Sequence, residues 1–237
     1  MKTNSNIYTF IYSSVLVVVV AAALAITNGA LKERQAKNVE IDKMQQILKS
    51  LNVEATSQDA DAVYRKTIIQ SYLINNKGEV IDTSSFSTFN KEISKEVGKP
   101  ASERALPVFE ALIKGETKFV FPVYGAGLWG PIWGYIALNA DKNTIFSVSF
   151  SHQGETPGLG AEISTDKFQH QFVGKHLFIN GLFKSIAVLK PSDKIENSDR
   201  VDGISGGTIT SHGVNNMLQN SLSAYESFLK DTEHEIQ

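Results

Sequence analysis

The chain has 237 residues, of which 42% are apolar, and this suffices for one large or two small domains with an ordinary core. Its 23 basic and 25 acidic residues give a formal charge of -2 with no basic stripe, so nucleic acid is not an expected partner. The absence of cysteine excludes disulfides, iron-sulfur ligation, zinc-thiolate sites and thiol nucleophiles within this chain.

An uncharged apolar run extends from Ile7 to Ile26. About 20 such residues cross a bilayer as a helix, and an export signal has a shorter apolar core of about 7 to 15 residues. We therefore expect a retained transmembrane helix. The alternative is a cleaved signal peptide, because Lys2 gives a basic start and Ala23–Ala25 resembles a cleavage site. The span is followed by Lys32, Arg34 and Lys37. Positive charges favour the cytoplasmic side, so these residues argue against export of the rest of the chain and leave the topology open.

The next segments alternate between helical and strand patterns. Apolar residues at three- and four-residue steps from Val39 to Leu51 predict an amphipathic helix. Thr67 to Ile81 predicts two strands around the turn Asn75–Gly78, and the polar stretch Thr83–Thr88 predicts a loop.

Four further strands are predicted, at 118–124, 132–138, 144–150 and 183–189, with a turn at 139–143. One apolar helical face from Val214 to Leu229 predicts a final helix that packs on the sheet. Strands in hairpin order with helices at the ends indicate an α+β fold with a mixed or antiparallel sheet, rather than a doubly wound parallel sheet.

Residues Gly125–Gly130 match the dinucleotide fingerprint G-x-G-x-x-G. That motif binds a pyrophosphate only where it opens a helix, whereas Pro131–Leu138 lacks helical periodicity, so no nicotinamide site is expected. Two interpretations stay open. Trp129 and Trp133 fill the core beside a tight loop, or the glycines let the backbone approach a planar ligand that lies near Trp129.

A second loop, Gly154–Gly160, has the composition of an ordinary turn. It also suits the edge of a ligand, because Thr156 and backbone amides can bond polar ligand groups and Glu155 can accept from a donor.

A third cluster, Asp202–Ser211, precedes the final helix. Plain capping by Thr210 or Ser211 would explain one hydroxyl. Several hydroxyls around Gly206 and Gly207 instead favour a phosphate esterified near the helix N-terminus, where free amides and the helix dipole stabilise an anion. The lysine of a nucleotide P-loop is absent.

Other polar residues carry weaker signals. Lys190 ends a predicted strand and would pair with a phosphate only if the fold brings it near Thr208; otherwise it is a solvated charge. The five histidines lack metal-ligand spacing, and there is no hydrolase triad order, so neither metal ligands nor catalytic residues are predicted.

Taken together, the runs GAGLWGPIWGYIAL, GETPGLGAE and DGISGGTITSHGV resemble the C subunit of the sodium-translocating NADH:quinone oxidoreductase over most of the chain. In that family the pattern D-x-x-S/T-G-A-T marks covalent flavinylation. The resemblance thus implies that a flavin transferase attaches FMN to Thr208 through its phosphate. This chain has Gly207 where the family usually has Ala, a small-for-small change.

The resemblance also implies a set of cofactor contacts in the same three loops. Besides Thr208 they are Ser205, Gly206, Gly207, Glu155, Thr156, Gly158, Leu159, Leu128 and Trp129, and less directly Lys190. NADH oxidation and quinone reduction would then take place in partner subunits, because this chain has no expected nicotinamide site and no iron-sulfur ligands and would act only within the complex.

By the same resemblance, residues 1–28 form a membrane anchor, 29–60 a helical connector and 61–237 an FMN-binding domain on the periplasmic face of the bacterial inner membrane. The G subunit of the ion-translocating ferredoxin:NAD oxidoreductase complex shares the pattern and topology, although the GLWGPIWG run favours the quinone reductase. Two other functional classes stay open, a membrane-tethered flavin-binding sensor and an inert structural stalk of a membrane assembly.

Overall fold

The computed structural model describes residues 6–190, 192–193 and 198–231. The chain divides into two compact units, of which the first ends at Lys43 and the second begins at Met44. The boundaries expected between the membrane anchor, the helical connector and the FMN-binding domain, at residues 28 and 60, stay a prediction.

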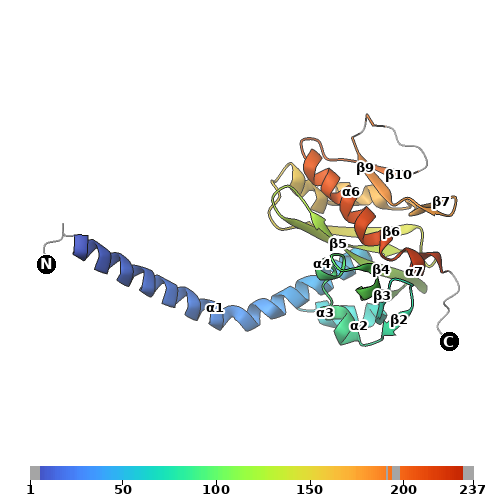
Figure 1. Ribbon diagram of the computed structural model, residues 1–237. Coiled ribbons are helices and arrows are strands. Elements are labelled where there is room, and N and C mark those ends of the chain that lie inside the picture. Colours follow the sequence, from blue (N-terminus) through green and yellow to red (C-terminus); the bar gives the residue numbers. More distant parts are fainter. Residues whose placement is uncertain (1–5, 191, 194–197, 232–237) are drawn as a thin grey trace. The chain divides into compact units, whose positions relative to one another are not determined.

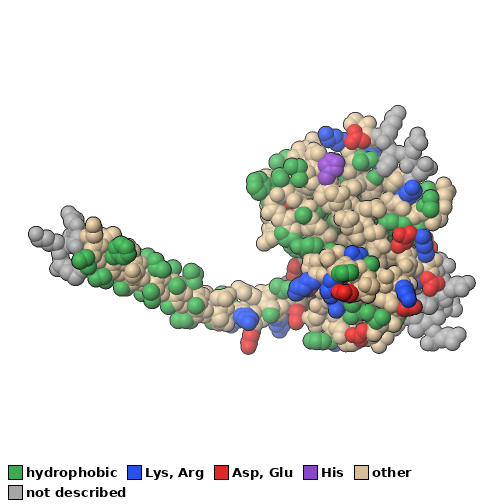
Figure 2. All heavy atoms as spheres, in the orientation of Figure 1, with side chains coloured by type: hydrophobic (Ala, Val, Ile, Leu, Met, Phe, Trp, Pro, Cys, Tyr) green, Lys and Arg blue, Asp and Glu red, His purple; other side chains and the backbone are tan. Residues whose placement is uncertain are grey.

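The described part of the first unit lies within helix α1, Asn6–Ser50, so the apolar run and the predicted amphipathic helix are one continuous helix. Apolar side chains cover its surface from Ile7 to Ile26 (Figure 2). By length and composition this helix can cross a membrane, which is consistent with the expected anchor.

The second unit is built on a six-stranded sheet of order β2-β1-β3-β4-β5-β6, in which all neighbours are antiparallel (Figure 1). Its strands are β1 Ile68–Ile74, β2 Val80–Asp82, β3 Leu106–Ile113, β4 Glu116–Ala126, β5 Pro131–Leu138 and β6 Ile145–His152. The turn between β1 and β2 forms because the Asn75 side chain accepts the amides of Lys77 and Glu79, while Gly78 adopts φ +84°. The predicted hairpins around residues 75–78 and 139–143 are confirmed.

Alternating side chains of the strands build a core on each face of the sheet. One core packs against α6, Thr208–Ser223, and α7, Glu226–Lys230, and includes Phe121 and Phe228. The other joins Val120 and Tyr135 to Ile47 on α1 and to Leu51 directly after this helix. The predicted α+β class is confirmed.

Short elements complete the unit. They are α2 Ala60–Thr67, α3 Ser85–Asn90, α4 Ile93–Glu96, η1 Ala101–Glu103, η2 Gly160–Ser164, α5 Asp166–Gln169, η3 His170–Phe172, β7 Phe178–Ile179, β8 Leu182–Phe183, β9 Ile186–Leu189 and β10 Asp199–Asp202.

Several local predictions were wrong. The expected loop at 83–88 is mostly α3, because the Ser84 hydroxyl caps the helix by accepting the Ser87 amide. The expected strand 183–189 is interrupted at Ser185, where φ is +57°. The final helix ends at Ser223 and resumes as α7, although its predicted apolar face is buried throughout.

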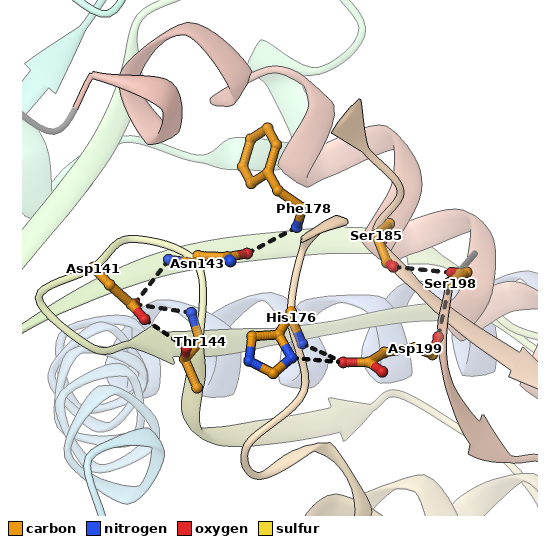
Figure 3. Close-up of polar contacts among 8 residues, drawn as sticks. All are labelled: Asp141, Asn143, Thr144, His176, Phe178, Ser185, Ser198 and Asp199. Atoms are coloured by element: carbon orange, nitrogen blue, oxygen red, sulfur yellow. Dashed lines mark hydrogen bonds and ion pairs between the residues drawn. The ribbon is translucent and has the colours of Figure 1, made fainter. Parts of the chain in front are cut away.

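Polar contacts anchor the segment that leads to α6 (Figure 3). The Asp199 carboxylate at the start of β10 accepts the His176 amide at 2.6 Å and lies 3.0 Å from His176 Nδ1. Asn143, in the turn before β6, accepts the Phe178 amide at 2.8 Å. Strand β10 then pairs in parallel with β9 and delivers the chain to the N-terminus of α6.

Candidate functional site

The site begins with three loops that the fold brings together. The first, residues 127–130, closes the β4–β5 hairpin with a hydrogen bond of 2.8 Å from the Gly127 amide to the Gly130 carbonyl. The second, residues 153–159, follows β6, and the third, residues 203–207, connects β10 with α6.

The buried Glu155 side chain joins the first two loops to the first turn of α6. Glu155 is only 4% exposed. Oε1 accepts the Trp129 amide at 2.8 Å and Oε2 accepts the Thr210 hydroxyl at 2.5 Å. Both carboxylate oxygens therefore satisfy protein donors, as a buried charge requires.

Glycines make room for this carboxylate. A Cβ on Gly127 would lie 2.5 Å from Glu155 Oε1, and a Cβ on Gly160 would lie 2.5 Å from Thr210 Oγ1. A Cβ on Gly213 would collide with the Ala126 carbonyl oxygen, so the first half of α6 packs directly on the β4–β5 hairpin. These glycines serve close packing rather than a dinucleotide turn.

Thr208 is the first residue of α6 and is half-buried. Within the described part of the chain its hydroxyl makes no hydrogen bond, and no side chain caps the helix at Gly207. Capping by Thr210 or Ser211 was a wrong alternative. Thr210 bonds Glu155, while the Ser211 hydroxyl accepts the Ile204 amide and donates to the Gly207 carbonyl, both at 2.9 Å.

Large apolar side chains are exposed on the same loops and at the start of α6. We call them the apolar rim: Leu128, Trp129, Leu159 and Ile209. Trp129 is 69% exposed, although its backbone is fixed by Glu155. Leu159 reaches the third loop, because a Cβ on Gly206 would lie 2.7 Å from its Cδ2 atom. Such exposed apolar groups on fixed backbone suit a planar ligand.

The two tryptophans have different roles. Trp129 is not a core residue. Trp133 lies half-buried on β5, where its Nε1 donates to Gln46 Oε1 on α1 at 2.9 Å. Only Trp129 belongs to the apolar rim.

The remaining predicted site residues lie at the edges of these loops. Ser205, Thr156 and Gly158 are exposed, and the Gly158 amide donates to Glu162 Oε1 at 3.1 Å. Lys190 is exposed next to Leu189, whose carbonyl accepts the Gly203 amide at 2.7 Å. No ion pair of Lys190 occurs among the described residues, so its role stays a prediction.

Sequence reasoning missed one residue beside the site. The His152 ring nitrogen Nδ1 accepts the Glu155 amide at 3.2 Å. No ligand-type spacing marks this histidine, because its partner is a backbone amide.

Geometry and chemistry here fit an esterified flavin. A free hydroxyl at an uncapped helix N-terminus suits a phosphate, since the first-turn amides and the helix dipole stabilise an anion. The apolar rim suits the ring system. A separate cavity of about 770 Å³ is lined by Gly125 and Ala126 but by none of the predicted cofactor contacts.

Comparison with known proteins agrees with this geometry. Residues 127–223 match the FMN-binding domain family, so this segment contains all three loops and α6.

Whole-chain relatives extend the match beyond that domain. The C subunit of the Na(+)-translocating NADH-quinone reductase from Haemophilus ducreyi is 31% identical over 234 residues, covering 92% of this chain and 91% of that protein. Its counterpart from Pasteurella multocida is 31% identical over 231 residues, covering 86% of each. The crystal structure of the C subunit from Parabacteroides distasonis is 49% identical, with a TM-score of 0.78 over 84% of this chain and 96% of that one. The chain therefore belongs to the family of the C subunit of the Na(+)-translocating NADH-quinone reductase.

Proposed function

We propose that this chain is the membrane-anchored electron-transfer subunit of a Na(+)-translocating NADH-quinone reductase and that FMN is esterified through its phosphate to Thr208 Oγ1. The proposal rests on Thr208, which is the first residue of a helix that has no side-chain cap. Among the described residues its hydroxyl has no hydrogen-bond partner. The match of residues 127–223 to the FMN-binding domain family supports the choice of cofactor.

The chain's own residues would receive the phosphate. In the attachment step Thr208 Oγ1 forms a new bond to phosphorus, AMP leaves from FAD, and the hydroxyl proton is released. A flavin transferase would catalyse this exchange. Ser211 fixes the 203–207 loop, because its hydroxyl accepts the Ile204 amide and donates to the Gly207 carbonyl. The first-turn amides of α6 would then face the ester's negative charge.

The other loops would orient the ring system. Leu128, Trp129 and Leu159 offer exposed apolar surface on a backbone that Glu155 fixes. We propose that Glu155 positions the site rather than bonding the cofactor, because both of its oxygens already accept protein donors. Thr156, Gly158 and Ser205 would contribute at the exposed edge.

When bound, FMN supplies one-electron transfer, and the protein supplies attachment, orientation and electrostatics. We propose that NADH oxidation and quinone reduction belong to partner subunits, since this chain has no cysteine for iron-sulfur ligation and no nicotinamide-binding helix after Gly130. The domain would face the periplasm of a bacterial inner membrane. The relatives favour the quinone reductase over the ferredoxin:NAD complex.

The test is production of the full chain with a flavin transferase, followed by denaturing mass measurement and in-gel fluorescence. We expect the mass to rise by FMN less one water, and Thr208→Ala to abolish both signals. Ser223→Ala is the matched control, because it removes an exposed hydroxyl at the opposite end of α6, outside the attachment pattern, and should leave attachment intact. Persistence of the bound flavin in Thr208→Ala would reject this site.

A further inference from the structure

His152 ends β6 and is half-buried. Its backbone is fixed by the sheet, because it pairs with Ile132 on β5 and the next amide, that of Gln153, donates to the Pro131 carbonyl at 3.1 Å. The ring therefore extends from a rigid strand end toward the loop that carries Glu155.

The contact between them depends on the protonation state of the ring. The Glu155 amide donates to His152 Nδ1 at 3.2 Å. An acceptor nitrogen must carry a lone pair, so this bond requires the neutral imidazole with its proton on Nε2. A protonated ring has no acceptor, and its Nδ1–H would face the amide N–H as a second donor.

We propose that His152 is a positioning residue of the flavin site that acts only in its unprotonated form, an inference that rests on the proposed function of Thr208. The neutral ring holds the Glu155 backbone, and the Glu155 carboxylate in turn fixes the Trp129 amide and the Thr210 hydroxyl. Thr210 is two residues from the attachment threonine. Protonation of His152 releases the Glu155 amide and loosens the loop on which the carboxylate is mounted.

The other ionisable side chains near β6 make no hydrogen bond or ion pair with this ring within the described residues. Those on the elements packed against β6 and on the loop itself are Tyr135, Glu155, Glu162, Asp166, Lys167 and His170. Glu162 accepts the Gly158 amide, and Asp166 is paired with Lys49. A pH response of the Glu155 amide that His152→Asn removes is thus assigned to His152.

The first measurement is the hydrogen-exchange protection factor of the Glu155 amide in the full chain in detergent, carried out on the flavin-free Thr208→Ala background. We expect protection in the otherwise unaltered chain to fall about 3- to 10-fold from pH 8 to pH 5, the loss that one hydrogen bond represents. His152→Asn, whose Oδ1 accepts without titrating, should keep protection constant across this range. His152→Leu should be poorly protected at every pH.

His170→Asn is the matched control, because His170 is exposed and lies outside the site. It should retain the pH response of the unaltered chain. An invariant protection factor from pH 8 to pH 5, or equal losses in His152→Asn and His152→Leu, would overturn the proposal. The unaltered chain and His152→Asn decide the matter even if His152→Leu does not fold.

The second measurement uses the flavin-loaded chain. The visible circular dichroism of the flavin should change between pH 8 and pH 5, and His152→Asn should remove that change. A chain that takes up no covalent flavin refutes the proposed function while the amide measurement still tests His152. Loaded protein whose spectrum changes with pH equally in His152→Asn refutes the role of His152 alone.

Discussion

The Thr210 hydroxyl donates a hydrogen bond of 2.5 Å to the Glu155 carboxylate, although 55 positions separate the two residues in the chain. The bond ties the first turn of α6 to the loop after β6. Because the other oxygen of the same carboxylate accepts the Trp129 amide, one side chain links the turn that begins with Thr208 to the backbone of Trp129 in the apolar rim.

Glu155→Gln should weaken this arrangement. A glutamine can accept the Trp129 amide and donate to the Thr210 hydroxyl, but both bonds lose their charged acceptor, and the cost is about 1–2 kcal/mol of unfolding free energy. Urea denaturation of the full chain in detergent measures it. Glu162→Gln is the control, since the bond that Glu162 accepts from Gly158 is exposed. Equal stability of the two variants would contradict this role of Glu155.

Gly160→Ala should destabilise the chain by a similar route. Its Cβ would overlap the Glu155 carboxylate and the Thr210 hydroxyl, so one of these groups must move. We expect a loss of about 1–3 kcal/mol in the same denaturation assay. Gly154→Ala serves for comparison, because a Cβ there meets nothing within 4 Å and φ is not positive. Equal unfolding free energies of Gly160→Ala and Gly154→Ala would contradict this packing role of Gly160.

The neighbouring glycines of the attachment pattern should respond oppositely to alanine. Gly207→Ala, which restores the family's usual residue, places a Cβ 3.0 Å from the half-buried Ile204 and requires no unusual backbone. Its stability should change by less than about 1 kcal/mol, and flavin attachment should persist. Gly206→Ala should lose about 1–2 kcal/mol, because φ is +75° and Leu159 lies 2.7 Å from the new Cβ.

Covalent flavin yield and thermal denaturation read out both variants. A Gly206→Ala chain as stable and as fully modified as Gly207→Ala would show that the turn accommodates a side chain.

Glu96 should make stability depend on acid pH. Burial acts to raise the pKa of this carboxyl, but hydrogen bonds from Lys99 and the Ala105 amide, together with the Lys91 charge, hold the pKa below its usual value. A carboxyl whose pKa is lower in the folded state stabilises the fold at pH values above its unfolded pKa of about 4.3. This stabilisation is lost as the pH falls through the folded pKa.

Glu96→Gln should therefore cost about 1–3 kcal/mol at pH 7, with a difference from the unaltered chain that shrinks below about pH 4. The free energy of unfolding between pH 7 and pH 3 measures this. Glu92→Gln removes an exposed partner of Lys95 and should have little effect. A constant difference for Glu96→Gln down to pH 3 would show that its charge is not the cause.

Local patterns predicted the strands whose turns are encoded in sequence. The segments around Asn75–Gly78 and residues 139–143 combine turn residues with flanking apolar alternation, and both hairpins formed. Strand β3 was missed because its residues are buried in continuous order rather than alternately, with Pro107 among them. Helix α3 was missed because its Ser-rich composition resembles a loop until the Ser84 cap is seen.

The candidate site was predicted unevenly. Motif resemblance singled out Thr208 and the three loops, which are short contiguous stretches that the fold brings together; their cofactor contacts stay a prediction. Neither the Glu155 bonds to Trp129 and Thr210 nor the His152 contact is written in any local pattern, because each joins groups that only the tertiary fold brings within reach.

The convergence of two loops and the first turn of α6 on one carboxylate limits how the domain can be recombined. Transplanting the 127–130 loop from a homologue without its matching 153–160 segment and first turn of α6 leaves a buried anion with a mismatched donor set. Chimeras of this domain should keep these three stretches from a single parent.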